Sequence, residues 1–147
     1  MGRNLFDEQI NNTTNAYNKA LYYLIDPDII LKVGENSKSL DQYLWYREAS
    51  SITIMTGFNP FSQIATAGEN RRNQFHLQQL VQSLELPFTE GINIDPKGDF
   101  PNEYTIGVFD MAFYTGIQIA RTFRQRAIFY YPFKGEGRLV WCKSKYF

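Results

Sequence analysis

Short apolar runs separated by polar turns dominate the chain, and most of them predict β-strands. The clearest is the run SITIM at 51–55, because β-branched residues suit a buried, pleated strand. Two earlier runs flank Asp26-Pro27-Asp28, and this spacing predicts a β-hairpin. The predicted strands are 20–25, 29–33, 51–55, 88–94, 104–109, 127–131 and 139–142.

Helical signals occupy the segments between these strands. In the longest segment, 69–84, an apolar stripe recurs at the spacing of one helix face, and Pro87 ends the pattern. Ser39 is predicted to cap a short helix over 40–47, and Asp110 to cap a helix over 111–123. The expected inner stripe of that last helix is Phe113, Ile117, Ala120 and Phe123 or Arg124.

The order of these elements predicts an α+β fold in a single domain, residues 1–147. From residue 51 the order is β-α-β-β-α-β plus an extra C-terminal strand, with an N-terminal β-hairpin and a short helix before it. This is the order of a ferredoxin-like split βαβ sheet with its helices on one face. Residues 1–19 are predicted to form a peripheral arm or helix, since the Asn/Thr cluster at 11–15 disfavours a helix interior.

Composition excludes several classes of function. Lys+Arg and Asp+Glu balance at 15 each, so no overall field attracts nucleic acid or an acidic membrane. The N-terminal residues lack the apolar core of a signal peptide, and no apolar run approaches the roughly 20 residues that span a bilayer. We therefore expect a cytoplasmic protein with no nucleic-acid partner and no membrane association.

Cysteine and histidine each occur once, as Cys142 and His76. One cysteine excludes an intramolecular disulfide and cysteine-rich metal sites within one chain. Phosphate-binding glycine loops, dinucleotide-binding fingerprints and HExxH are absent. No cofactor and no metal site is predicted.

The connection between the strand at 51–55 and the long helix holds the best candidate ligand-binding residues. Thr56, Asn59 and Ser62 offer hydrogen-bonding groups at the end of a buried strand. Asn70 and Arg72 lie near a helix start, where free N–H groups and the helix dipole favour an anion. Turn and capping roles explain the same residues locally.

The predicted strand directions bring three connections to one edge of the sheet: 56–70, 95–103 and 124–126. Arg124 and Gln125 would there hold the anionic part of a ligand. Asp95 and Glu103 are the candidate catalytic carboxylates, although DPKGD at 95–99 is also typical of an exposed turn.

Each of these connections carries a recognisable sequence motif. They are TGFNPFS at 56–62 followed by Glu69-Asn70, DPKGDFP at 95–101 and FRQRAI at 123–128. The first resembles the T-x-x-N-P-x-S…E-N signature of a bacterial family of uncharacterised proteins, domain-of-unknown-function family 3293, and the other two resemble further motifs of that family. Gly57 stands where the family pattern has alanine, and 102–104 fits its E-x-S segment only loosely. The resemblance implies a small, soluble bacterial domain and brings no established activity.

Three hypotheses about function follow. The first is a binding domain for a polar or anionic small ligand, a nucleotide for example, at the three-loop sheet edge. The second is a hydrolase or transferase with Glu103 or Asp95 as general base, with or without a divalent cation. The third is a protein–protein interaction module or homodimer that uses an aromatic surface or a sheet edge.

Overall fold

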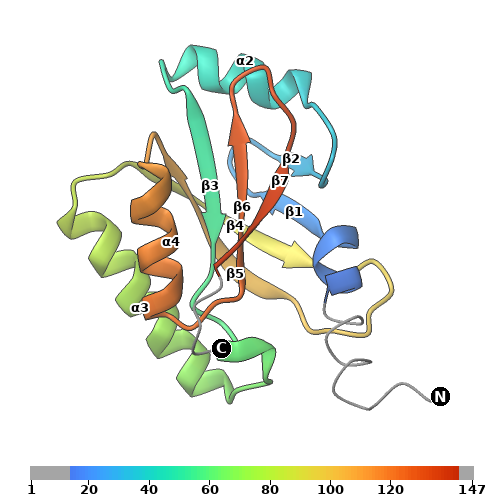
Figure 1. Ribbon diagram of the computed structural model, residues 1–147, viewed down its shortest axis with the longest axis vertical. Helices are drawn as coiled ribbons and strands as arrows, with labels where there is room; N and C mark the ends of the chain where they lie inside the picture. The colour runs from blue at the N-terminus through green and yellow to red at the C-terminus, as the bar shows by residue number, and fades with distance from the viewer. Residues whose placement is uncertain (1–13, 143–147) are drawn as a thin grey trace.

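The computed structural model describes residues 14–142, which form one antiparallel seven-stranded sheet with helices on both faces (Figure 1). The strand order is β2-β1-β4-β5-β3-β6-β7, and each neighbouring pair is antiparallel. The predicted mixed class of helices and strands is confirmed. The strands are β1 (Leu21–Leu24), β2 (Ile29–Leu31), β3 (Ser51–Met55), β4 (Phe88–Ile94), β5 (Glu103–Phe109), β6 (Ala127–Pro132) and β7 (Arg138–Trp141).

The predicted hairpin is present, since β1 pairs with β2 across the turn at 25–28. Asp28 has a φ of 64°, a left-handed conformation that Asp tolerates better than most residues. The hairpin also pairs with β4, in a register that places Tyr22 beside Asn93. This second pairing joins the N-terminal hairpin to the main sheet.

Helix positions agree with the sequence pattern, but the three N-caps differ, the first two by one turn or less. Ser37, and not Ser39, caps α2 (Lys38–Tyr46) by accepting a hydrogen bond from the Leu40 N–H. Thr66 caps α3 (Ala67–Ser83), so this helix begins two residues before the predicted start at Glu69. Residues 14–19 are also helical, which favours the helix over the arm in the described part of the N-terminal segment.

The prediction that Asp110 caps the last helix is wrong. Helix α4 (Phe113–Thr122) begins after Ala112, and the Asp110 carboxylate instead accepts hydrogen bonds from the Ser50 N–H and hydroxyl, both at 2.7 Å. The buried stripe is correspondingly shifted, because Phe113 is 42% exposed. The buried residues of α4 are Gly116, Ile119 and Ala120.

The two faces of the sheet hold separate apolar clusters. Helices α3 and α4 cover one face, where Leu77 and Ile119 pack with Ile106 and Val108. Helix α2 covers part of the other face, where Leu40 and Leu44 pack against strand residues that include Ile52. Figure 1 shows α3 and α4 side by side and α2 across the far end of the strands.

The sheet curls around the face that α2 covers. Two hydrogen bonds join the segment after β2 to the segment before β7, although β2 and β7 are the opposite edge strands of the sheet. The Gly34 N–H donates to the Gly137 carbonyl at 2.8 Å, and the Gly137 N–H donates to the Glu35 carbonyl at 3.0 Å. A Cβ on Gly107 would lie 2.6 Å from a methyl group of Ile52, so the absence of a side chain lets this concave face pack closely. Among residues 14–142, every helix is too short or too polar to cross a bilayer.

Candidate functional site

Three side chains form a row across the concave face, at the end far from α2. Tyr22 on β1 is the cross-strand partner of Asn93 on β4, and Asn93 is the partner of Glu103 on β5. Directly opposed residues have Cβ atoms about 5 Å apart and point to the same face. The row therefore places a phenol, a carboxamide and a carboxyl group side by side on rigid backbone.

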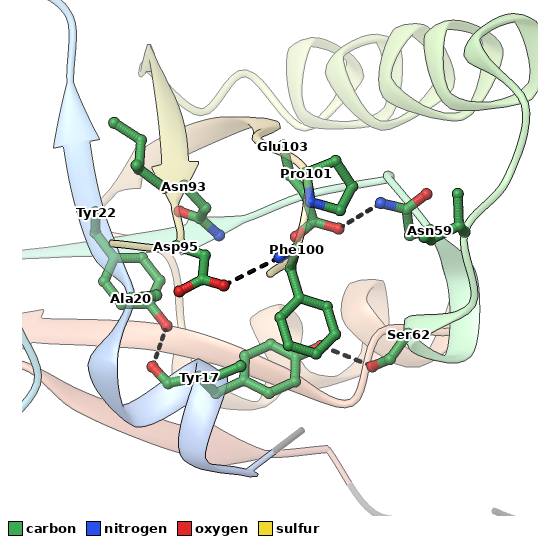
Figure 2. Close-up of a pocket in the computed structure, with 13 residues that line it drawn as sticks. Tyr17, Ala20, Tyr22, Asn59, Ser62, Asn93, Asp95, Phe100, Pro101 and Glu103 are labelled. Carbon is green, nitrogen blue, oxygen red and sulfur yellow. Dashed lines mark hydrogen bonds between the residues drawn. The ribbon is translucent and has the colours of Figure 1, made fainter. Parts of the chain in front are cut away.

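A cavity lies over this row (Figure 2). Its volume is about 610 Å³, counting the space at its open mouth. The helical residues 14–19 contribute Tyr17 to one wall, and the turn after β4 contributes Phe100. The loop after β3 supplies Asn59 and Ser62. Segments far apart in the sequence thus enclose one space, as a binding site requires.

Glu103 and Asn59 connect the floor of the cavity to its loop wall. The Asn59 amide Nδ2 donates to Glu103 Oε2 at 2.8 Å, as Figure 2 shows. Asn59 Oδ1 accepts from the Ala65 N–H and from Asn70 Nδ2, both at 3.0 Å. The Asn70 Oδ1 in turn accepts from the Asn59 N–H at 2.8 Å. Asn59 therefore holds its loop against the start of α3 and also contacts the carboxyl group of the cavity.

Burial gives Glu103 unusual acid–base properties. Removal of the carboxyl group from water raises its pKa from 4.5 to about 7, although the hydrogen bond from Asn59 acts in the opposite direction. Burial also raises the pKa of the Tyr17 and Tyr22 phenols, so both remain neutral near pH 7. Glu103 is thus the group in the row that changes charge near neutral pH.

A side-chain network fixes the start of the loop that carries Asn59. The Thr56 hydroxyl donates to the Tyr104 carbonyl at 2.6 Å. The Gly57 N–H donates to Gln74 Oε1 on α3 at 2.8 Å. A Cβ on Gly57 would lie 2.8 Å from the Asn73 backbone, so this loop requires glycine for its close approach to α3.

The next residues of the loop have unfavourable backbone conformations. Asn59, Phe61 and Ser62 have φ values of 49°, 56° and 61°. Asn tolerates this left-handed region, but a bulky aromatic residue rarely adopts it. The Ser62 hydroxyl lies 3.0 Å from the Tyr17 hydroxyl, and the Tyr22 hydroxyl donates to the Tyr17 carbonyl. These contacts join the loop to the N-terminal helical wall.

Asp95 lines the cavity but has a turn-forming role. Its carboxylate accepts hydrogen bonds from the backbone N–H groups of Lys97, Asp99 and Phe100, at 2.9–3.0 Å. These bonds, that from Lys97 above all, lower the pKa of the Asp95 carboxyl. Asp95 is therefore ionised at neutral pH and unsuited to act as a general base.

The structure separates the other predicted ligand-binding residues. Gln125 is buried, and its Nε2 donates to the Phe58 carbonyl at 2.9 Å, so the predicted meeting of the two loops is confirmed. Arg72 is exposed on α3 and follows the first helical turn. Arg124 is exposed as well, with its guanidinium 5.8 Å from the centre of the Phe61 ring. Neither arginine lines the cavity.

Four residues that line the cavity were not predicted from the sequence: Tyr17, Tyr22, Asn93 and Phe100. The polar Asn93 between apolar neighbours was the available signal, because a buried strand position seldom holds an amide. The pairing of β1 with β4 makes Tyr22 its neighbour, and nothing local in the sequence encodes that pairing. Within residues 14–142, no group of three or more His, Cys, Asp or Glu side chains could hold a metal ion.

The site thus defines a small α+β domain with a largely buried carboxyl group at the floor of an open cavity. Residues 55–128 match a family model described as protein of unknown function (DUF3293), and the chain belongs to that family. The match confirms the resemblance found in the sequence and includes Asn59, Asn93 and Glu103. No curated protein and no solved structure matches the chain.

Proposed function

We propose that the protein binds a small polar ligand in the cavity above Tyr22, Asn93 and Glu103. The observation that carries this proposal is the Glu103 carboxyl group, which is largely buried yet borders an open cavity. Ionisation of a carboxyl group that is largely removed from water lowers the stability of the fold, and hydrogen bonds from a bound ligand can offset that cost. Ligand sites are typically concave and mostly apolar with a few placed polar groups, as here.

Backbone strain near the cavity supports the same proposal. Three residues of left-handed conformation occur within four positions, and two of them, Asn59 and Ser62, border the cavity. Conformations of this kind cost free energy and cluster at ligand sites, where a defined loop shape is useful. The hydrogen bonds of Asn59 and Gln125 hold the loop in that shape.

The proposal retains a small polar ligand but not the requirement for an anion. An anionic group, such as that of a nucleotide, was expected because of Arg72 and Arg124. Both are exposed and lie outside the cavity lining. Thr56, Asn70 and Gln125 are assigned to the support of the loop, and Asn59, Ser62 and Glu103 to the cavity itself.

A thermal-shift screen of the full chain against metabolites, nucleotides and divalent ions tests the proposal. Ala20→Phe is the cavity-filling variant, because Ala20 lines the cavity. Glu90→Gln is the matched control, since Glu90 is exposed and lies near Gln78 of α3 on the other face. We expect a ligand whose stabilisation is lost in Ala20→Phe and kept in Glu90→Gln. Ligands that stabilise all three proteins equally would contradict the proposed site.

A second candidate function is acid–base catalysis by Glu103, in a hydrolase or a transferase. The observation in its favour is the pKa of Glu103, about 7, because a general acid or base works best when its pKa is near the working pH. Asp95 is not proposed as its partner, because backbone N–H groups hold that carboxylate. Conversion of a bound ligand by the native protein, and not by Glu103→Gln, would favour catalysis over binding.

We also propose that β3 to β6 form a ferredoxin-like split βαβ unit, to which the hairpin and β7 are additions. The strand order β4-β5-β3-β6, with α3 and α4 on one face, supports this description. A bacterial, cytoplasmic setting remains part of the same proposal, and its bacterial part is what the family resemblance implies.

A further inference from the structure

The floor of the cavity offers hydrogen-bond acceptors that the protein leaves incompletely used. Asn93 Oδ1 is buried and has no hydrogen-bond partner among the described residues. The neighbouring Glu103 carboxylate has four acceptor sites, and the hydrogen bond described for it is the one from Asn59. Because Asn93 and Glu103 are cross-strand partners, one ligand group with several N–H donors can reach both.

The charges around the cavity favour a positive ligand group. Glu103 and Asp95 are the ionisable carboxyl groups that line it, and no lysine, arginine or histidine of the described residues does so. Arg126 lies near enough to Tyr17 to act on the pKa of that phenol, but it is not part of the lining. An ammonium or guanidinium group would therefore meet complementary charge, whereas a carboxylate or phosphate would meet like charge.

The walls of the cavity suit the remainder of such a ligand. Tyr17 and Tyr22 line one side, and Phe100, 40% exposed, lies at the turn after β4. Aromatic faces attract organic cations and pack against apolar carbon chains. Figure 2 shows these rings around the space in front of Glu103.

We propose that the ligand is an organic cation, a primary amine or guanidinium compound with an apolar body, whose N–H groups bind Glu103 and Asn93. This inference rests on the proposed function, because it names the chemistry of the ligand in the same cavity. Asn93 supplies a neutral acceptor beside the charged one, and the aromatic walls hold the apolar body. Asn59, which also lines the cavity, orients the Glu103 carboxylate through the hydrogen bond that its Nδ2 donates.

Isothermal titration calorimetry with four probes tests the inference on the full chain at pH 8. Benzylamine and agmatine are the cations, benzyl alcohol the neutral analogue and benzoate the anion. We expect both cations to bind, and benzyl alcohol and benzoate to bind at least tenfold more weakly. Glu103→Gln and Asn93→Leu should each weaken the cations by tenfold or more, and Glu90→Gln should leave them unchanged.

The pH dependence provides a second readout. A cation binds the ionised form of Glu103, so affinity should fall between pH 8 and pH 6 as that carboxylate takes up a proton. The other titrating groups that line the cavity keep their charge state in this range: the Tyr17 and Tyr22 phenols stay neutral, and the Asp95 carboxylate stays ionised. In Glu103→Gln, this pH dependence should disappear.

The outcomes separate this inference from the proposed function. Benzoate or benzyl alcohol binding as tightly as the amines, or amine binding that survives Glu103→Gln, would overturn the cationic class. A failure of both amines to bind at millimolar concentration would overturn it as well. If Ala20→Phe abolishes binding of a neutral or anionic ligand from the screen, the cavity remains the site and only the cation is wrong. If no ligand responds to Ala20→Phe, both proposals fail.

Discussion

The Asn59 side-chain amide lies 2.8 Å from the Glu103 carboxylate, and it joins a strained loop to β5, which carries the last residue of the Tyr22–Asn93–Glu103 row. The two residues are 44 positions apart in the sequence. Their contact supports the cavity wall, and it opposes the rise in the pKa of Glu103 that burial causes. Changes at either residue should therefore affect stability and pH response together.

Glu103→Gln should stabilise the protein at alkaline pH. The pKa of Glu103 is about 7 in the folded protein and 4.5 ordinarily, so the folded state binds the proton more tightly than the unfolded state. The resulting contribution to the free energy of unfolding is fully present below pH 4.5 and is lost as pH rises through 7. Glutamine mimics the protonated acid and still accepts from Asn59. The difference in free energy of unfolding, Glu103→Gln minus native protein, should therefore increase by as much as about 3 kcal/mol between pH 4.5 and pH 8.

Urea denaturation of both proteins at pH 4.5, 6 and 8 measures this difference. Other titrating groups cancel in the comparison, because they are common to both proteins. Glu90→Gln is the control and should show no such trend, since Glu90 is exposed. A difference between the native protein and Glu103→Gln that is independent of pH would show that the carboxyl titrates normally.

Asn59→Asp should destabilise the protein through Glu103. Aspartate tolerates the φ of 49° and still accepts from Asn70 and Ala65, but it loses the donor to Glu103 and adds a like charge. We expect a loss of about 1–3 kcal/mol at pH 8, in line with an unpaired buried polar group. The double variant Asn59→Asp/Glu103→Gln should recover most of it, since glutamine can donate to the new carboxylate. Additive effects of the two single changes in this cycle would argue against the contact.

Gly57→Ala should destabilise the fold, although alanine is the residue of the family pattern at this position. The new Cβ would lie 2.8 Å from the backbone of Asn73, so α3 has to shift, at a cost of about 1–3 kcal/mol. Gly68→Ala on the same helix is the matched control, because its Cβ would meet nothing within 4 Å. That change should be neutral or stabilising by up to about 1 kcal/mol. Thermal denaturation of both variants decides the matter, and equal effects would be inconsistent with the close approach of loop and helix.

Cys142 should behave as a packing residue. It is fully buried, and burial raises the pKa of its thiol to about 11, so little thiolate exists at pH 8. A disulfide reagent such as DTNB should react slowly in native buffer and rapidly in denaturant. Labelling of the native protein at the rate of a free thiol would disprove this role, and Cys142→Ala should leave ligand binding unchanged.

Local pattern was sufficient to predict most elements but not their ends. The Asp26-Pro27-Asp28 turn and the β-branched run at 51–55 are signals within one element, and both predictions are confirmed. The prediction that Asp110 caps α4 was wrong because its carboxylate instead accepts hydrogen bonds from Ser50, 60 positions away. A side chain that can cap a helix can equally bond a distant backbone, and sequence does not distinguish the two.

The candidate site was predictable only in part for the same reason. The sequence located the loop that contains Asn59 and Ser62, and it named Glu103, because turn and strand-end residues are recognisable locally. Tyr22 and Asn93 were missed, since they face the cavity only through the pairing of β1 with β4. The cavity wall formed by Tyr17 also depends on a tertiary contact, that with Ser62. Arg72 was expected nearby, but the earlier start of α3 places it beyond the first turn.

Amide chemical shifts in a nitrogen-15 NMR titration test the central claim most directly. The ligand is the strongest binder from the thermal-shift screen, added to the full chain. We predict that the largest shifts occur at Tyr22, Asn59, Asn93 and Glu103, and that Ala20→Phe abolishes them. Shifts confined to the exposed aromatic residues Trp45 and Tyr46 of α2, with none along the Tyr22–Asn93–Glu103 row, would contradict the account.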